Sequence, residues 1–216
     1  MNCLVIAATP VEIAPFLSEF RGRGMAHQGI DVLITGIGLT TTTYSLTRQL
    51  RIKKPDLIIQ AGVAGCFDRK ISLGTVVAVQ RDIMADESVI ESQKLKTKFD
   101  LKLAFPNKFP YSKGWLVNKS GELKKLKLRK VKGISVNQIT ASVSIFGLYK
   151  QKFNPAVESM EGAALHYVCL MEQIPFIQLR SVSNYITERN KRKWKMKDAI
   201  TNLNHELNSL VNQLSD

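Results

Sequence analysis

Three polar side chains in this sequence stand where predicted strands end, and their types suit proton transfer and hydrogen bonding. Glu12 follows the apolar run of residues 2–8, Glu161 follows "NPAVES", and Asn184 ends "PFIQLRSVSN". A carboxylate can act as a general base or accept hydrogen bonds from hydroxyl groups, whereas an amide both donates and accepts. Two carboxylates and an amide at strand ends therefore indicate a site that holds a polar small molecule and activates water.

Each of these residues also has a purely structural interpretation. Asparagine is a common turn residue, so Asn184 is also consistent with the closing of a strand. Glu161 is also consistent with a charge that stabilises a helix N-terminus, and Glu12, two residues after Pro10, with an exposed first helical turn. Taken singly, the three residues leave both interpretations open.

Short β-rich runs alternate with longer amphipathic runs, which predicts strands and helices in turn. Strands are expected at residues 2–8, 31–38, 55–65, 74–83, 131–137 and 176–183, and helices at 40–52, 144–153, 160–173 and 193–214. This alternation predicts an α/β fold, a three-layer αβα sandwich with a central mixed, mainly parallel twisted sheet. Ligands bind beyond the carboxyl ends of strands in such sheets, where the three polar side chains are expected.

The composition indicates one soluble globular domain over residues 1–216. Hydrophobic residues make up 44% of the chain and charged residues 23%, and no apolar run reaches the roughly 18 to 20 residues that span a bilayer. The N-terminus is typical of a first strand and not of a signal peptide. Three cysteines, widely spaced in apolar surroundings, favour buried thiols in a reducing cytoplasm.

The net charge of +13 lies mainly in three lysine-rich runs, at residues 94–103, 121–133 and 189–197. No nucleic-acid-binding motif accompanies these runs, so they are interpreted as solvated surface that also helps to attract an anionic substrate. The lysine-rich segment of about 87–133 shows little periodicity and is expected to be a variable insertion or lid area. The histidines lack the spacing of metal ligands, so no metal site is expected.

Four segments in chain order resemble the nucleoside phosphorylase/nucleosidase superfamily. They are "AATPVEIAPF" (residues 7–16), "PDLIIQAGVAGCFDRKISLGTVVAVQRDI" (55–83), "VESMEGAALHYVC" (157–169) and "RSVSN" (180–184). Each segment is weakly specific by itself, but the four together cover most of the chain outside its lysine-rich middle.

The resemblance implies cleavage of a purine N-riboside without a cofactor. It gives Glu161 the role of accepting hydrogen bonds from two ribose hydroxyls, with Met160 against the sugar face. It gives Glu12 the role of general base that activates a water molecule. The remaining substrate-binding residues that it implies are Ala64, Gly65, Arg180 and Ser183.

The nucleophile is expected to be water and not phosphate. Phosphorylases of this superfamily use an arginine and a serine around the third-strand turn, and residues 60–63 here, "QAGV", contain neither. The charge of Glu12 would also repel phosphate. Arg21, Arg23 and Arg48 remain alternative phosphate contacts, so phosphorolysis stays open.

Asn184 indicates which base leaves. An aspartate occupies the matching position in the methylthioadenosine/adenosylhomocysteine nucleosidases, which release adenine. An amide can donate to a 6-oxo group and accept from a protonated N7, which favours hypoxanthine. The segments "QRDIMADESV", "LAFPN" and "SNYITERNKRKWKMKDAI" resemble the futalosine hydrolase subfamily of the menaquinone pathway.

The sequence therefore predicts a nucleosidase that hydrolyses a small 6-oxopurine nucleoside, with futalosine as the expected substrate. Adenine-releasing nucleosidases and purine nucleoside phosphorylases on the same fold are the alternatives, and a non-enzymatic basic module that binds nucleic acid is a third. Neither a nucleic acid nor a membrane is an expected partner. The superfamily resemblance also implies a homo-oligomer, a dimer or larger.

Overall fold

The computed structural model describes residues 1–22 and 29–215 of the chain. Its strands are β1 (Cys3–Ala7), β2 (Ile30–Ile34), β3 (Leu57–Cys66), β4 (Val76–Asp82), β5 (Ser88–Glu91), β6 (Lys94–Thr97), β7 (Tyr111–Ser112), β8 (Trp115–Val117), β9 (Lys130–Ser135), β10 (Val157–Ser159) and β11 (Phe176–Tyr185). Its α-helices are α1 (Ala14–Gly22), α2 (Leu39–Ile52), α3 (Gly121–Lys125), α4 (Val143–Phe153), α5 (Gly162–Met171) and α6 (Met196–Ser215). Short 3-10 helices cover Pro10–Ile13 and Lys191–Lys193.

Nine strands form one mixed sheet, in which β2, β1, β3 and β11 pair with one another in this order as parallel strands. The strand β10 pairs antiparallel with β3 and parallel with β9, and β9 pairs parallel with β4. The strand β11 pairs with both β3 and β4. Pairing therefore runs in a closed ring through β3, β10, β9, β4 and β11, so the sheet curls upon itself at this end.

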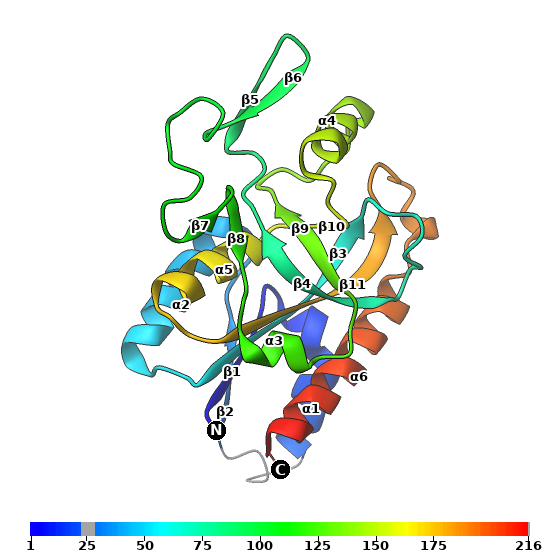
Figure 1. Ribbon diagram of the computed structural model, residues 1–216. Coiled ribbons are helices and arrows are strands. Elements are labelled where there is room, and N and C mark those ends of the chain that lie inside the picture. Colours follow the sequence, from blue (N-terminus) through cyan, green and yellow to red (C-terminus); the bar gives the residue numbers. More distant parts are fainter. Residues whose placement is uncertain (23–28, 216) are drawn as a thin grey trace.

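One face of the sheet packs against the first and last α-helices. Cys3, Val5 and Ala7 of β1 point to this side and share a hydrophobic cluster with Leu203 and Leu207 of α6. Alternate residues of a strand point to opposite faces, so every second apolar residue of β1 is available to this layer. Figure 1 shows α1 and α6 side by side along this face.

The opposite face packs against α2 and α5. Leu4 and Ile6 of β1 point to this side and contact a cluster that includes Leu46 of α2 and Leu165 of α5. Figure 1 shows these two helices together on the side of the sheet away from α6. The three-layer αβα arrangement with a central mixed sheet is therefore confirmed.

The segment 87–133 contains regular structure that the weak sequence pattern does not reveal. The β5–β6 hairpin stands apart from the main sheet, at the top of Figure 1. Further along, β8 pairs with β4 and so extends the main sheet. Leu116 of β8 and Leu123 of α3 are buried, so part of this segment belongs to the core.

Two helices begin later than the sequence pattern predicts. The helix α5 begins at Gly162, because residues 157–159 pair with neighbouring strands as β10 and Glu161 takes the cap position. The helix α6 begins at Met196 and not at residue 193, because the backbone of Trp194 is extended and its indole N–H donates to the carbonyl of Glu188 at 2.8 Å. No helix among the described residues is long and apolar enough to cross a membrane.

Candidate active site

A pocket of about 400 Å³ opens beyond the carboxyl ends of β1, β3, β10 and β11. Seven of the eight residues that the sequence suggests for the site line this pocket, namely Glu12, Ala64, Gly65, Met160, Glu161, Ser183 and Asn184. The eighth, Arg180, is buried behind the pocket wall. The fold therefore brings together residues that are as far apart as 172 positions in the sequence.

Glu12 is held by the turn that precedes it and by β3. Pro10 begins a 3-10 helix, and the Glu12 carboxylate closes its first turn by accepting from the backbone N–H of Thr9 at 3.1 Å. The other carboxylate oxygen accepts from the backbone N–H of Val63 at 3.0 Å. From the neighbouring helix α6, the side chain of Asn204 donates to the backbone carbonyl of Glu12 at 2.9 Å. Both oxygens are thus fixed in direction while the residue stays half-buried at the pocket.

Glu161 is almost completely buried, and its carboxylate points away from its own helix. One oxygen accepts from the backbone N–H of Gly38 at 3.1 Å, and the other lies 3.6 Å from the guanidinium of Arg180. No N–H of α5 is capped by this side chain. Burial raises the pKa of Glu161, and the nearby Arg180 charge opposes that rise. The contacts therefore direct the carboxylate into the pocket and not to the helix N-terminus.

Arg180 supports the site from behind. Its guanidinium donates to the side-chain oxygen of Gln60 at 2.9 Å, and only 1% of the residue is exposed. A Cβ atom on Gly62 would lie 2.3 Å from Arg180 Nη1 and 3.0 Å from Glu12 Oε1. The absent side chain of Gly62 therefore leaves the space in which Arg180 approaches the carboxylates of Glu12 and Glu161.

Asn184 lies next to an irregularity in β11. The register of β11 against β3 shifts between Val182 and Asn184, so Ser183 is the extra residue. The Ser183 hydroxyl donates to Asn184 Oδ1 at 2.9 Å, and Asn184 Nδ2 donates to the carbonyl of Tyr185 at 3.2 Å. Bulges of this kind redirect side chains, and they are common beside active sites. The strand continues to Tyr185, so Asn184 does not end it.

Several residues that line the pocket are not among those that the sequence suggests for the site. Glu158 is buried, accepts from the backbone N–H of Thr140 at 3.0 Å and has a pKa raised by burial. Its place two residues before Met160 on an extended segment puts both side chains on one face, which is the signal that identifies it. Glu188, Arg189 and Trp194 lie on the connection between β11 and α6 and also line the pocket.

A second group of buried polar side chains lies behind the start of α5. Asp82 accepts from the Ser135 hydroxyl at 3.0 Å and from the backbone N–H of Ile83 at 2.8 Å. Ser135 Oγ in turn accepts from the backbone N–H of Ala163 at 2.8 Å, which fixes the first turn of α5. Burial raises the pKa of Asp82 to about 6. Burial lowers the pKa of His166, on the same helix, to about 4.

The described residues contain no group of three or more histidine, cysteine, aspartate or glutamate side chains that could hold a metal ion. Of the three arginines that left phosphorolysis open, one has a described side chain. Arg48 is exposed on α2 and does not line it. Arg23 lies outside the described residues, and the side chain of Arg21 is not described either.

The sheet topology and the pocket at its strand ends define the class of protein, and the family comparison agrees. The model of the phosphorylase superfamily matches residues 5–213, so the chain belongs to this superfamily. The chain is 26% identical to a futalosine hydrolase of Thermus thermophilus, over 96% of this chain and 94% of that protein. It is 24% identical to a 5′-methylthioadenosine/S-adenosylhomocysteine nucleosidase of Buchnera aphidicola, over 72% and 66% of the two chains.

The fold also matches solved structures. The native structure of futalosine hydrolase of Helicobacter pylori superposes with a TM-score of 0.78, over 99% of this chain and 98% of that one, at 18% identity. This likeness shows a shared fold over almost the whole length of both chains.

Proposed function

We propose that this protein is a purine nucleosidase that hydrolyses the N-ribosidic bond of a 6-oxopurine nucleoside. The proposed substrate is futalosine, which reacts with water to give hypoxanthine and dehypoxanthine futalosine in menaquinone biosynthesis. The observation that carries the proposal is the convergence of Glu12, Glu161 and Asn184 on one pocket, with Arg180 behind the two carboxylates. The similarity to a futalosine hydrolase over nearly the full length supports the choice of substrate.

Glu12 has the position required of a general base. Its two oxygens accept three hydrogen bonds from Thr9 and Val63, and a carboxylate has about four lone-pair sites. The remaining site faces the pocket, where it can orient and deprotonate a water molecule. The water attacks the anomeric carbon while the bond to the base breaks, so the proton passes to Glu12 and the electron pair leaves with the purine.

Glu161 and Met160 hold the sugar. The Glu161 carboxylate keeps free lone pairs beyond those used by Gly38, and it can accept from the two ribose hydroxyls. Charged acceptors make stronger hydrogen bonds than neutral ones, so this clamp fixes the sugar against the attacking water. Met160 offers a polarisable surface beside it.

Asn184 recognises the base. Its amide nitrogen already donates to the backbone carbonyl of Tyr185, which can only accept, and this fixes which end of the amide is donor and which is acceptor. The second amide N–H is then available to a 6-oxo group, and the second lone pair of the oxygen to a protonated N7. A purine with a 6-amino group would place two donors face to face, which leaves buried polar groups unpaired.

The charge of the pocket favours water over phosphate as the nucleophile. Among the described lining residues, Glu12, Glu158, Glu161 and Glu188 are acidic and Arg189 is the one cation. Four carboxylates would repel phosphate ions. Arg189 lies at the rim, where it can pair with a carboxylate at the distal end of a substrate such as futalosine.

The test is to incubate the purified protein with futalosine, inosine and methylthioadenosine, with and without phosphate, and to follow free base by chromatography. Hypoxanthine from futalosine in phosphate-free buffer is the expected result. Glu12→Gln should abolish turnover and leave substrate binding largely intact, whereas Glu91→Gln, a surface control that pairs with Lys96, should have no effect. Release that needs phosphate, or adenine as the main product, contradicts the proposal.

We also propose that the enzyme works in the cytoplasm as a homo-oligomer. The three cysteine thiols are free and buried, which suits a reducing compartment. Leu103, Phe105 and Phe109 are largely exposed on one connecting segment, and exposed apolar groups of this size are typical of contact surfaces. Light scattering on the purified protein tests the oligomer, and a monomer at micromolar concentration contradicts it.

A further inference from the structure

A second pocket of about 490 Å³, here called the basic pocket, lies at the amino-terminal ends of β9 and β10. It shares no lining residue with the candidate active site. Its lining carries five cations and one carboxylate, namely Arg81, Arg129, Lys130, Lys132, Lys150 and Asp68. These residues come from β4, β9, α4 and the connections around them, so the fold gathers cations that are up to 69 positions apart.

An irregularity in β4 aims two consecutive side chains at this pocket. The register of β4 against β9 pairs Val79 with Val131 and then Arg81 with Lys132, so Gln80 is the extra residue of a bulge. Consecutive residues of a regular strand point to opposite faces, yet Gln80 and Arg81 both line the pocket. The bulge therefore places Arg81 opposite Lys132 on the neighbouring strand, with both residues in the pocket lining.

This arrangement costs stability unless an anion occupies the pocket. Like charges directly opposite each other on paired strands are destabilising. Asp68 accepts one hydrogen bond from Arg129 at 3.3 Å, whereas the described residues supply no carboxylate partner to Arg81, Lys132 or Lys150. The pKa of Asp68 is lowered by a backbone hydrogen bond from Lys70 and further by the charges of Arg129 and Lys150. The formal charge of the lining is +4.

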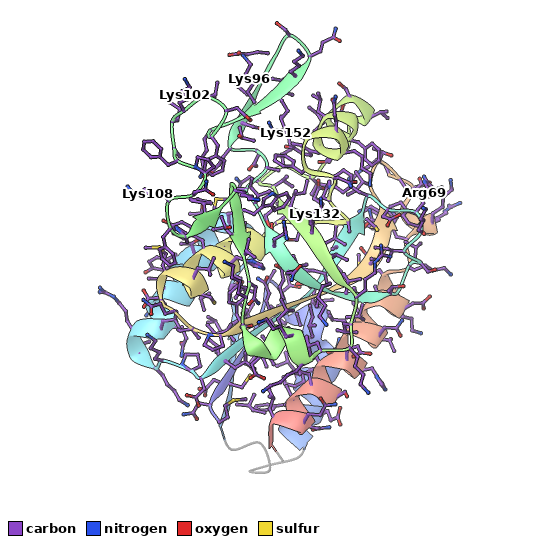
Figure 2. The ribbon with its side chains drawn as sticks, in the orientation of Figure 1. Arg69, Lys96, Lys102, Lys108, Lys132 and Lys152 are labelled. Atoms are coloured by element: carbon purple, nitrogen blue, oxygen red, sulfur yellow. The ribbon has the colours of Figure 1, made fainter. Side chains whose placement is uncertain are left out.

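Surface lysines that serve only for solubility are expected to spread out, and Figure 2 shows both kinds of placement. Lys132 lies near the middle of the sheet in this view, whereas Lys96, Lys102 and Lys108 lie apart from it on the β5–β6 hairpin and the connection to β7. Within the lysine-rich run at residues 121–133, Lys132 is partly buried at this pocket, whereas Arg129 and Lys130 line it while remaining exposed. The ammonium of Lys130 also donates to the backbone carbonyl of Leu126.

We propose that the basic pocket binds a small, multiply charged phosphate compound, with a diphosphate group as the part that it recognises. Arginine side chains present planar pairs of donors that match phosphate oxygens, and Arg81 and Arg129 lie on the same lining. The volume is within the range of about 300 to 1,000 Å³ that is usual for small-ligand sites. The cations surround a concavity and do not form a stripe, which favours a compact anion over a nucleic-acid strand. The proposal does not depend on the nucleosidase activity.

The test is isothermal titration calorimetry of the full chain with inorganic diphosphate at about 150 mM salt, where weak surface electrostatics are screened. One saturable site per chain is expected. Arg81→Gln and Lys150→Gln should each weaken binding by about tenfold, because each removes a charged donor to the ligand. Lys108→Gln removes the same charge from a distant, exposed position and should leave the binding unchanged.

Three results would overturn the proposal. The first is the absence of saturable binding, and the second is equal weakening by Lys108→Gln and Lys150→Gln, which would mean that only the overall charge matters. The third is tighter binding of a single-stranded RNA than of diphosphate at equal phosphate concentration. Lys150 lies half-exposed on a helix, so its replacement is not expected to disturb folding, and thermal melting of both variants checks this. Futalosine hydrolysis should be unchanged in Lys150→Gln.

Discussion

Two buried titratable groups, Asp82 at the end of β4 and His166 on α5, should affect stability in opposite directions over nearly the same range of pH. The pKa of Asp82 rises from its ordinary value of 3.8 to about 6 in the folded protein. Between these values the folded protein holds a proton that the unfolded chain has lost, so the contribution of Asp82 to stability falls as pH rises. A pKa difference of about 2 corresponds to a decrease of about 3 kcal/mol in the free energy of unfolding by pH 7.

His166 has the opposite sign. Its pKa falls from 6.5 to about 4 on folding because the ring is buried, and the contact of Nδ1 with the carbonyl of Leu116 at 3.0 Å opposes that fall. Between these values the unfolded chain holds a proton that the folded protein lacks, so stability increases as pH rises. On acidification, the free energy of unfolding therefore falls by about 3 kcal/mol through His166. The two contributions should nearly cancel between about pH 4 and pH 6.

Single replacements should separate these contributions. Asp82→Asn should match the wild type near pH 4 and exceed its stability by about 3 kcal/mol at pH 7, because the amide carries no buried charge. His166→Gln should match the wild type at pH 7 and exceed it by up to about 3 kcal/mol near pH 4. Urea unfolding of the three proteins at pH 4, 5, 6 and 7 measures these differences. Differences that do not vary with pH would refute the shifted pKa values of Asp82 and His166.

Three further outcomes concern the candidate active site. Asn184→Asp should reduce kcat/KM for futalosine, followed as hypoxanthine release, at least tenfold, because a carboxylate cannot donate a hydrogen bond to a 6-oxo group. An unchanged kcat/KM would show that Asn184 does not recognise the base. Gly62→Ala should destabilise the protein by about 1–3 kcal/mol in urea unfolding and impair turnover, because the new methyl group displaces Arg180. Gly121 has open space around it, so Gly121→Ala is the control and should change neither stability nor turnover. Arg180→Met should lower kcat by more than tenfold and alter the pH profile of kcat, because the buried Glu161 carboxylate then lacks its neighbouring cation. A pH profile identical to that of the wild type would show that Arg180 does not set the charge state of Glu161.

Much of the fold could be predicted, because the spacing of apolar residues and the local composition are enough to identify the long helices and strands. The apolar run of β1 and the amphipathic pattern of α6 each follow from burial on two faces or on one. The closed ring of strands could not be predicted in this way. Its closure depends on β3 pairing with β10 and β11, and no local pattern encodes a partner that is about 90 residues or more away.

The residues of the candidate site also differ in whether a local sequence pattern reveals them. Glu12, Glu161 and Asn184 were accessible to prediction because polar residues at the ends of apolar strands are conspicuous. The burial of Arg180 could not be predicted, because its position behind the pocket depends on the absence of a side chain at Gly62 and on Gln60 of the adjacent strand β3. The basic pocket was hidden for a similar reason, since a bulge in β4 decides where Arg81 points.

The pairing of β11 with both β3 and β4 has a consequence for the order in which the protein is made. A ribosome synthesises the chain from the N-terminus, so β3 and β4 emerge about 90 residues or more before their shared partner at Phe176–Tyr185. Until that strand arrives, one edge of β3 and one edge of β4 are left open. Arg180 and Asn184 also lie on this late strand, so the nascent chain has neither a closed ring nor a complete pocket until its last fifth is synthesised.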